Sequence, residues 1–347
     1  MSLKKIRTVL ILPLLSINSL IAQDLSVKYA ETITQDDLKM HLSYIASDEL
    51  EGRETGKRGQ YLAALYLADQ FEKLGLTKIV PLGKYHSYFQ WFNVAAKGKR
   101  QTLLAKDQTL PDGFEELASM NVLGFLEGTT KKEEVIVITA HYDHLGIGSK
   151  GEIHNGADDD GSGTSAVLEI AEAFSKAKQE GHGPERSILF MLVAGEEKGL
   201  LGSKYFADHD PVIPLHKIVC NLNIDMIGRK DEHHESDEYI YIIGSDKISS
   251  ELHRINEAEN IKHTDFLLDY TYNDEKDPNR FYYRSDHYNF AKNGIPVIFY
   301  FSGVHEDYHK PGDDIDKILF SKYSKITKHI FYTAWTIVNK TDRLIID

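Results

Sequence analysis

The chain has 347 residues, a formal net charge of −13 and a single cysteine. This acidic balance argues against a protein that binds nucleic acid, because neutralising phosphates requires a Lys- and Arg-rich surface. One cysteine excludes an internal disulfide, a Cys-rich zinc ribbon and an iron–sulfur cluster. A bound metal must therefore be held mainly by His, Asp and Glu side chains.

The first residues have the pattern of an export signal. Three basic residues, the last of them Arg7, precede an apolar run over 9–15, and a second apolar stretch ends near Ala22. A basic segment, a short apolar segment and a small residue before a polar one are typical of a cleaved signal peptide. The run is too short to span a bilayer. We expect residues 1–22 to be a signal peptide, residues 23–347 to form one domain, and the product to be periplasmic or extracellular without a membrane span.

Two helices are predicted early in the mature chain. Thr34 is a suitable N-cap with Asp37 facing back toward it, so a helix begins after Thr34. A second helix is expected from Gly59 to Leu74, and its apolar side is predicted to carry Leu62, Leu65, Phe71 and Leu74. Residues 76–120 show no clear pattern and are too few for a further domain of usual size.

From Asn121 onward the chain alternates between apolar strands and helices. Strands are predicted at Val135–Thr139, Ile188–Val193, Ile218–Ile224 and Ile295–Phe301. Helices are predicted at Thr164–Ala177, Ser203–His209, Ser249–Ala258, Asp286–Asn293 and Ser321–Val338. Strands that are apolar on both faces and alternate with helices predict an α/β domain around a largely parallel sheet.

Polar side chains follow each of these strands. Because the carboxyl ends of parallel strands meet at one edge of the sheet, we expect the polar residues there to lie close together. The residues concerned are His141 to His144, Glu196, Glu197, Asp225 and His305 to His309, together with Asp158 to Asp160 in the loop that opens a helix. Any one of them is compatible with an ordinary structural role such as helix capping or solvation. Their convergence on one edge is the strongest functional signal in the sequence.

Several familiar motifs are absent or misplaced. The Gly-rich loop around Asp158 lacks the Lys of a phosphate-binding P-loop, and its three carboxylates would repel phosphate. No G-x-S-x-G elbow is present. The stretch His305 to His309 matches H-E-x-x-H literally, but that motif requires a helix, and Pro311 and Gly312 would end one almost at once. We therefore expect only one of these two histidines, His309, to bind metal.

The number of candidate ligands indicates two metal ions. The candidates are His141, Asp158, Glu197, Asp225 and His309, with Glu196 beside them. A catalytic zinc usually has three protein ligands and a water, so five ligands are too many for one ion. They suit two ions if one carboxylate bridges them. Nitrogen and carboxylate donors favour zinc, and cobalt or manganese also fit such a set.

The ordered set of motifs resembles the secreted dinuclear-zinc aminopeptidase family, whose wider relatives include glutamate carboxypeptidases and glutaminyl cyclases. The segments that carry the resemblance are His141-Tyr142-Asp143, Gly156-Ala157-Asp158-Asp159, Gly195-Glu196-Glu197, Asn223-Ile224-Asp225-Met226, Tyr308-His309-Lys310-Pro311-Gly312-Asp313 and, near the N-terminus, Leu50-Glu51-Gly52-Arg53. The resemblance implies a single α/β domain with a mixed, mainly parallel central sheet and helices on both faces. By it, residues 23–347 are a zinc peptidase catalytic domain.

The resemblance also implies a role for each residue of the site. Asp158 would bridge two Zn²⁺ ions, the first held also by His141 and Asp225 and the second also by Glu197 and His309. Glu196 would be the general base that carries a proton from water to the leaving amine. Asp143 would orient the His141 ring through its carboxylate. Asp159 would form the unusual peptide found beside the bridging residue in relatives.

Two further residues are candidates for contact with a peptide substrate. Tyr308, next to His309, would stabilise the oxyanion, and Arg284 would contact the substrate, although a structural role is as compatible with either position. The expected reaction is removal of N-terminal residues from peptides. The alternatives are a glutaminyl cyclase, which uses the scaffold with one zinc, a carboxypeptidase or dipeptidase, and a non-catalytic receptor that has lost its metals.

Overall fold

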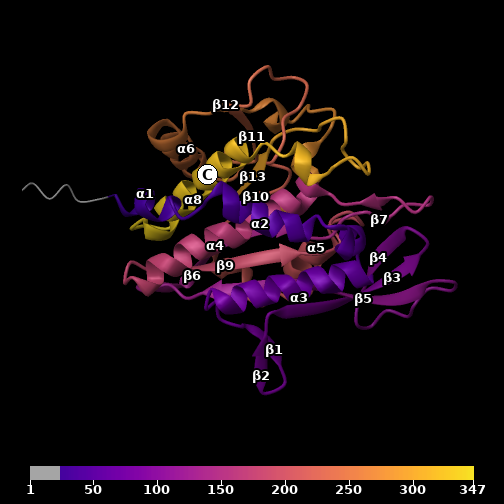
Figure 1. Ribbon diagram of the computed structural model, residues 1–347. Coiled ribbons are helices and arrows are strands. Elements are labelled where there is room, and N and C mark those ends of the chain that lie inside the picture. The colour runs from indigo at the N-terminus through magenta and orange to yellow at the C-terminus, as the bar shows by residue number, and fades with distance from the viewer. Residues whose placement is uncertain (1–23) are drawn as a thin grey trace, which may run out of the picture.

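The computed structural model describes residues 24–347 (Figure 1), so the predicted signal peptide, residues 1–22, lies outside the described residues. A central sheet has the strand order β12-β11-β13-β10-β6-β9-β5-β3-β4. The bounds of its strands are β3 (Phe89–Lys97), β4 (Arg100–Leu104), β5 (Glu115–Leu126), β6 (Lys131–His141), β9 (Arg186–Val193), β10 (Ile218–Ile224), β11 (Tyr239–Ile243), β12 (Leu267–Asp269) and β13 (Val297–Phe301).

The middle of the sheet is parallel and its flanks are mixed. The strands β13, β10, β6 and β9 are neighbours and pair in parallel. On one side β5, β3 and β4 continue the sheet in antiparallel fashion, and on the other β11 is antiparallel to β13 and parallel to β12. The predicted mixed sheet with a parallel centre is thus confirmed, and all four predicted strands are present. The carboxyl ends of these parallel strands lie at one edge of the sheet, which is where the polar residues that follow them are expected to meet.

Residues 76–120 contain structure that the sequence pattern does not reveal. They supply β3, β4, the start of β5 and a short hairpin of β1 (Val80–Leu82) and β2 (Tyr85–Ser87) that projects away from the sheet (Figure 1). Of these, β4 is an edge strand and β1 and β2 form a separate hairpin, whereas β3 lies inside the sheet, and all four have exposed positions. They therefore lack the continuous apolar run that marks a strand buried on both faces.

Helices cover both faces of the sheet. Their bounds are α1 (Leu25–Ala30), α2 (Gln35–Ile45), α3 (Arg58–Lys73), α4 (Gly163–Gln179), α5 (Leu201–Asp208), α6 (Ser250–Glu259), α7 (His287–Ala291) and α8 (Phe320–Asn339). Alternate residues of β6 enter two separate cores, because successive side chains of a strand point to opposite faces. Ile136 and Ile138 pack with α1 to α4 and α8, whereas Val135 and Val137 pack with Phe206 of α5 and Phe290 of α7. The expectation of helices on both faces is confirmed.

The helix predictions hold in position but not in every detail. Thr34 caps α2 as expected: its hydroxyl accepts a hydrogen bond from the Asp37 N–H at 3.1 Å and donates one to the Asp37 carboxylate at 2.7 Å. The predicted apolar side of α3 is wrong at Leu65, which is 58% exposed. The buried face is built instead on small alanines with Leu67 and Phe71, which let α3 approach the sheet closely. None of the helices formed by residues 24–347 is long and apolar enough to cross a membrane.

Candidate metal centre

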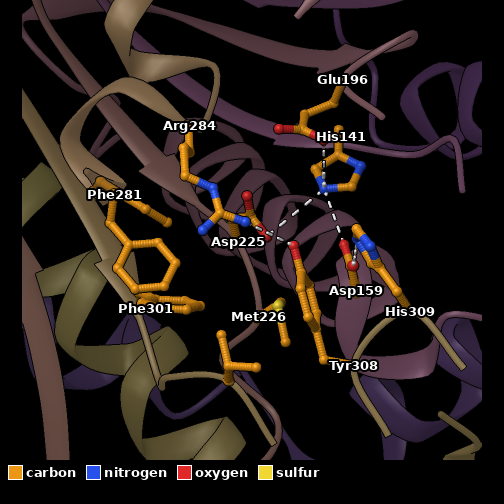
Figure 2. Close-up of a pocket in the computed structure, with 12 residues that line it drawn as sticks. His141, Asp159, Glu196, Asp225, Met226, Phe281, Arg284, Phe301, Tyr308 and His309 are labelled. Atoms are coloured by element: carbon orange, nitrogen blue, oxygen red, sulfur yellow. Dashed lines mark hydrogen bonds and ion pairs between the residues drawn. The ribbon is translucent and has the colours of Figure 1, made fainter. Parts of the chain in front are cut away.

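Charged side chains from the ends of the parallel strands lie close together, and Figure 2 shows His141, Glu196, Asp225 and His309 around one pocket. His141 is the last residue of β6, and Asp225 directly follows β10. Glu196 and Glu197 lie in the turn after β9, and His309 lies in the loop after β13. The convergence predicted from the strand ends is therefore present in the fold. Asp159 joins them from the loop over Ala157–Ser162 that precedes α4.

The first cluster surrounds the Nε2 atom of His141. That atom lies 3.2 Å from Asp159 Oδ1, 3.6 Å from Asp225 Oδ1 and 4.0 Å from Glu196 Oε2. Asp225 is held by a hydrogen bond from the Ser285 hydroxyl to its other oxygen at 2.6 Å. His141, Asp159 and Asp225 can together surround a metal ion.

The second cluster uses the other oxygen of Asp159. His309 Nε2 lies 3.2 Å from Asp159 Oδ2 and 3.3 Å from Glu197 Oε2. His144 contacts the other oxygen of Glu197, with its Nδ1 atom 2.8 Å from Glu197 Oε1. His144, Asp159 and Glu197 form a second group that could hold a metal ion. One carboxylate therefore faces two separate ligand clusters, each through its own oxygen.

The residue between the clusters is Asp159, not Asp158 as expected from the sequence. The Asp158 carboxylate accepts a hydrogen bond from the Gly228 N–H at 2.6 Å and lies 3.4 Å from His305 Nε2. It thus lies outside both clusters. Three consecutive aspartates point in three directions because the backbone turns at each residue of this loop, and Asp159 and Asp160 have non-helical dihedral angles. The unusual peptide expected at Asp159 is the cis bond between Asp159 and Asp160.

Two buried carboxylates fix the backbone around the clusters. Asp160 accepts hydrogen bonds from the N–H groups of His141, Gly163 and Met226 at 2.8–3.2 Å, so one side chain ties together the ends of β6 and β10 and the start of α4. Asp313 accepts hydrogen bonds from the Asp158 and Asp159 N–H groups at 3.0–3.1 Å. These bonds fix the loop that presents Asp159.

The Asp143 carboxylate lies 3.8 Å from His141 Nδ1, but the hydrogen bond to that nitrogen comes from another group of Asp143. Its backbone carbonyl, not its carboxylate, is hydrogen-bonded to His141 Nδ1 at 3.1 Å. The carboxylate accepts hydrogen bonds from the Thr55 hydroxyl at 2.7 Å and from the Glu196 N–H at 3.2 Å. A carbonyl can orient a metal-binding imidazole as well as a carboxylate can. Asp143 therefore supports both His141 and the turn that carries Glu196.

Arg53 stabilises the loops of the site through hydrogen bonds to their backbone. Its guanidinium is fully buried and donates to four backbone carbonyls, those of Ile45, Tyr142, Asn155 and Gly156. Two of these belong to the loop that leads to Asp159, and one lies next to His141. Arg53 has no carboxylate in direct contact among residues 24–347. Burial lowers the pKa of Arg53 to about 10, although the nearby aspartates oppose this shift.

Burial and charge set the protonation of the acidic groups. Burial raises the pKa of Glu196 well above its ordinary range, and the carboxylates of Glu197 and Asp225 add to this shift. Glu197 behaves differently: burial opposes its charged form, but the imidazoles of His144 and His309 lower its pKa to about 2. Two adjacent glutamates therefore have opposite preferences for a proton. Such a split is typical of an acid–base group beside a permanently charged one.

A pocket with about 350 Å³ of empty space, part of which is open solvent, lies against the first cluster. Arg284 and Tyr308 stand at its edge, with Arg284 Nη2 donating to the Tyr308 hydroxyl oxygen at 3.3 Å (Figure 2). The Tyr308 ring stacks on His309, with centroids 3.8 Å apart. The remaining wall is apolar and is formed by Met226, Phe281, Phe299, Phe301 and Val304. Both residues predicted to contact a substrate thus border the pocket.

The chemistry of the two clusters fits divalent metal ions. Asp159 Oδ2, Glu197 Oε1 and both ring nitrogens of His144 are buried without a hydrogen-bond partner among the described residues. Orphaned buried polar atoms are costly, and their concentration at one point requires an explanation such as a bound ion. Although burial favours the neutral ring, Asp159 and Glu197 raise the pKa of His309 to about 10. A metal ion would replace that proton, as is usual for imidazole ligands.

The sequence interpretation omitted three residues that the structure places here. His144 follows the first strand directly, but nothing in the local pattern distinguishes it from the other histidines. For Asp159 the sequence predicts only the unusual peptide beside the expected bridge. Asp313 lies in the loop after β13, and its role depends on a long-range contact that no local pattern records. The position of Asp159 relative to Asp158 likewise depends on the path of the loop backbone.

Comparisons with known proteins agree with this geometry. The model of peptidase family M28 matches residues 121–334, which is more than half of the chain. Aminopeptidase YwaD of Bacillus subtilis (strain 168) is 33% identical over 125 residues, which are 35% of this chain and 25% of that protein. The chain thus spans about a quarter of the length of that relative.

Solved structures share the fold. The LapA aminopeptidase of Legionella pneumophila has a TM-score of 0.68 and 20% identity, covering 99% of this chain and 81% of that chain. A glutaminyl cyclase of Bacteroides thetaiotaomicron bound to N-acetylhistamine has a TM-score of 0.62 and 18% identity, covering 87% of this chain and 98% of that chain. Similarity at these identities establishes the fold.

Proposed function

The chain belongs to peptidase family M28, and on that premise we propose that it is a zinc-dependent aminopeptidase acting on peptides with a free N-terminus. The observation that carries the proposal is the position of Asp159. Its Oδ1 atom faces His141, and its Oδ2 atom faces His309, each at 3.2 Å. The relative YwaD is named an aminopeptidase, which supports the same reaction.

We propose that the site holds two Zn²⁺ ions. His141, Asp159 and Asp225 would hold the first, and Asp159, Glu197 and His309 the second. Three carboxylates carry a charge of −3, which two divalent ions and one hydroxide would balance. Zinc suits a site of imidazole and carboxylate donors, and cobalt or manganese would also fit. Such ions supply Lewis-acid chemistry, because they polarise a carbonyl and make water more acidic.

Glu196 is the proposed proton carrier. Its Oε2 atom faces the pocket at 4.0 Å from His141 Nε2, and its side chain is only 12% exposed. Burial raises its pKa, which brings a carboxylate closer to the range in which it both accepts and returns a proton. Glu196 would take a proton from water and pass it to the leaving amine. Its backbone N–H is held by Asp143, which limits where the side chain can move.

Tyr308 is proposed to donate to the oxyanion of the reacting peptide. Burial raises the pKa of Tyr308 above its ordinary range, so its hydroxyl stays protonated. Arg284 donates to the Tyr308 oxygen, which leaves the hydroxyl hydrogen free to point into the pocket. A donor fixed before the reaction is the arrangement that stabilises developing negative charge.

The pocket supports a preference for apolar N-terminal residues. The Glu196 carboxylate, which is not one of the proposed zinc ligands, lines this pocket and would attract the free ammonium group of the substrate. The opposite wall, which includes Phe281 and Phe301, would accommodate an apolar side chain. A blocked N-terminus would lose the ammonium contact and is therefore expected to be a poor substrate.

Export remains part of the proposal. Residues 1–22 would act as a signal peptide, and residues 23–347 as the catalytic domain. Mass spectrometry of the protein after secretion from an expressing bacterium tests this directly. We expect a mature N-terminus near Gln23, and an uncut cytoplasmic product would contradict export.

The cyclase alternative is less well supported, although the fold is shared with a glutaminyl cyclase. The resemblance associates a cyclase with one zinc, whereas Asp159 here faces two clusters. Glu197 and His309 complete the second cluster. A site with both clusters in place favours hydrolysis. A carboxypeptidase or dipeptidase would use the same clusters and differs only in how the substrate is recognised.

The test is hydrolysis of a panel of aminoacyl-nitroanilides by the mature chain, with matched N-acetylated substrates. We expect cleavage of apolar aminoacyl-nitroanilides that stops with a chelator, returns with zinc and falls about 10²- to 10⁴-fold in Glu196→Gln. The variant should bind as much zinc as the wild type. Equal cleavage of acetylated substrates, or activity that persists in Glu196→Gln, would overturn the proposal.

A further inference from the structure

We infer that His144 is an additional protein ligand of the second metal position, so that the two positions are unequal. Asp159, Glu197, His309 and His144 would then hold the second ion, against three side chains for the first. The inference rests on the two-ion site of the proposed function. It concerns a histidine that follows the first strand but is not among the five metal ligands expected from the sequence or from the family resemblance.

The fold places the His144 ring in the cluster and restrains it there. His144 is fully buried, and its backbone N–H donates to the Arg53 carbonyl at 3.3 Å. A Cβ atom added at Gly156 would lie 2.5 Å from His144 Cδ2, so the ring occupies space that only glycine leaves open. Gly156 also has a φ of +54°, a conformation that favours glycine. The loop that carries Asp159 is therefore shaped to admit this ring.

The ring is not engaged in ordinary hydrogen bonds. Neither nitrogen of His144 has a hydrogen-bond partner among residues 24–347, and the same is true of Glu197 Oε1 and Asp159 Oδ2. His144 Nδ1 and Glu197 Oε1 are only 2.8 Å apart, yet they are not aligned as donor and acceptor. Two ligand atoms that lie close together without forming a hydrogen bond are expected when both of them point at the same metal ion.

The separations of the donor atoms match a coordination shell. His144 Nδ1 lies 2.8 Å from Glu197 Oε1 and 3.9 Å from Asp159 Oδ2. His309 Nε2 lies 3.2 Å from Asp159 Oδ2 and 3.3 Å from Glu197 Oε2. Ligand atoms about 2.0–2.1 Å from a tetrahedral zinc are about 3.3 Å from one another, and these distances lie on both sides of that value.

Two consequences follow for this chain. The second position has two imidazoles and the first has one, so the second should hold zinc or cobalt more tightly. The second ion should therefore be the last to leave during chelation. Removing the His144 imidazole should weaken the second position and leave His141, Asp159 and Asp225 able to bind.

The test measures zinc binding by the full mature chain rather than activity. Metal-free protein is titrated with zinc against a competing chelator, and bound zinc is counted after equilibrium dialysis. The variants are His144→Ala, His144→Gln and, as a matched control, His154→Ala. His154 is a neighbouring histidine whose ring centroid is 6.5 Å from that of His144.

We expect two zinc ions in the wild type and in His154→Ala. His144→Ala should bind one ion normally and the other at least about tenfold more weakly. His144→Gln keeps an N–H donor but no imidazole, so it should be as weak as His144→Ala. Because His144→Gln fills the cavity with a polar side chain, it still tests the inference if His144→Ala does not fold. X-ray absorption at the zinc edge should show fewer imidazoles per zinc in both His144 variants.

The possible failures are distinguishable. Two zinc ions bound with wild-type affinity by His144→Ala would overturn the inference and leave the proposed function intact. Full restoration by His144→Gln would also overturn it, because it would make His144 a residue that only positions Glu197 through a hydrogen bond. A wild-type chain that binds fewer than two zinc ions would overturn the two-ion site itself, and this inference with it.

Discussion

The carboxylate of Asp313 holds the backbone of Asp159, with the Asp159 nitrogen 3.0 Å from Asp313 Oδ2. The same carboxylate accepts the N–H of Asp158. Asp159 is the one side chain shared by both ligand clusters. A residue distant in sequence, on the loop after β13, therefore fixes the position of the shared ligand.

Removing this support should loosen metal binding without removing a ligand. We expect Asp313→Ala to lower zinc affinity about 10- to 100-fold, as is usual when a partner behind a ligand is lost. Asp313→Asn, which keeps one acceptor oxygen, should lose less. Zinc titration against a chelator measures the effect, and the exposed Asp316→Ala serves as control. Wild-type affinity in Asp313→Ala would show that the loop holds its shape unaided.

Which of the two residues, Asp158 or Asp159, bridges the metal ions can be tested by changing each one separately. Asp159→Asn should lose tight binding of both zinc ions, because it alters the shared ligand. Asp158→Asn should keep both ions, since its carboxylate faces Gly228 and His305 instead. Metal content after dialysis distinguishes the two. The reverse result, with zinc lost only in Asp158→Asn, would restore the assignment made from the sequence.

Tyr308 should affect turnover more than binding. We expect Tyr308→Phe to lower kcat about 10²- to 10³-fold, because it removes a donor aimed at the transition state. KM should change little, since the ring remains stacked on His309. Steady-state kinetics on an aminoacyl-nitroanilide measures both, with the exposed Tyr283→Phe as control. An unchanged kcat would assign Tyr308 a packing role.

Arg53 should be a stability determinant of the site loops. Arg53→Met leaves four carbonyls, three of them in buried hydrogen bonds, without their donor, and we expect a loss of about 3–5 kcal/mol in the free energy of unfolding. Arg58→Met, on the exposed side of α3, should change it by less than about 0.5 kcal/mol. Urea unfolding followed by circular dichroism checks both. Similar midpoints for both variants would contradict the proposed role of Arg53.

Acid should destabilise the fold partly through His329. Its ring is buried between Thr264 and Asn256, and burial lowers its pKa to about 3. An unfolded histidine titrates near 6.5, so below that pH the unfolded chain binds a proton that the folded chain refuses. Stability from this group is complete above pH 6.5 and falls by about 1.4 kcal/mol per pH unit between 6.5 and 3.

His329→Gln removes that titration. Relative to the wild type, the variant should lose less stability between pH 7 and pH 4 in urea unfolding. The exposed His86→Gln should follow the wild-type curve. If the free energies of unfolding of wild type and His329→Gln changed with pH in parallel, the His329 ring would take up its proton as readily in the folded chain as in the unfolded one.

The sequence predicted the parallel centre of the sheet and the edge on which the site lies. These predictions depend on long apolar runs and on residues at strand ends, both of which are local signals. The strands of residues 76–120 are not predicted because exposed and buried positions are mixed along them. Leu65 was misplaced because the buried face of α3 is defined by small alanines, which carry little hydrophobic signal.

Within the site, the residue types were predicted better than their roles. His141, Glu196, Glu197, Asp225 and His309 lie where the strand ends place them. The bridge was assigned one residue early, because three adjacent aspartates are equivalent until the loop path is known. His144 and Asp313 depend on packing between distant segments, which no local pattern contains.

The most direct test of the central claim uses one decapeptide in free and N-acetylated form. The zinc-loaded chain, the chelated chain and Glu196→Gln are incubated with each, and the products are identified by mass spectrometry over time. We expect stepwise loss of N-terminal residues from the free peptide by the zinc-loaded wild type alone. Loss of residues from the C-terminus, cleavage at internal bonds, or equal cleavage of the acetylated peptide would contradict it.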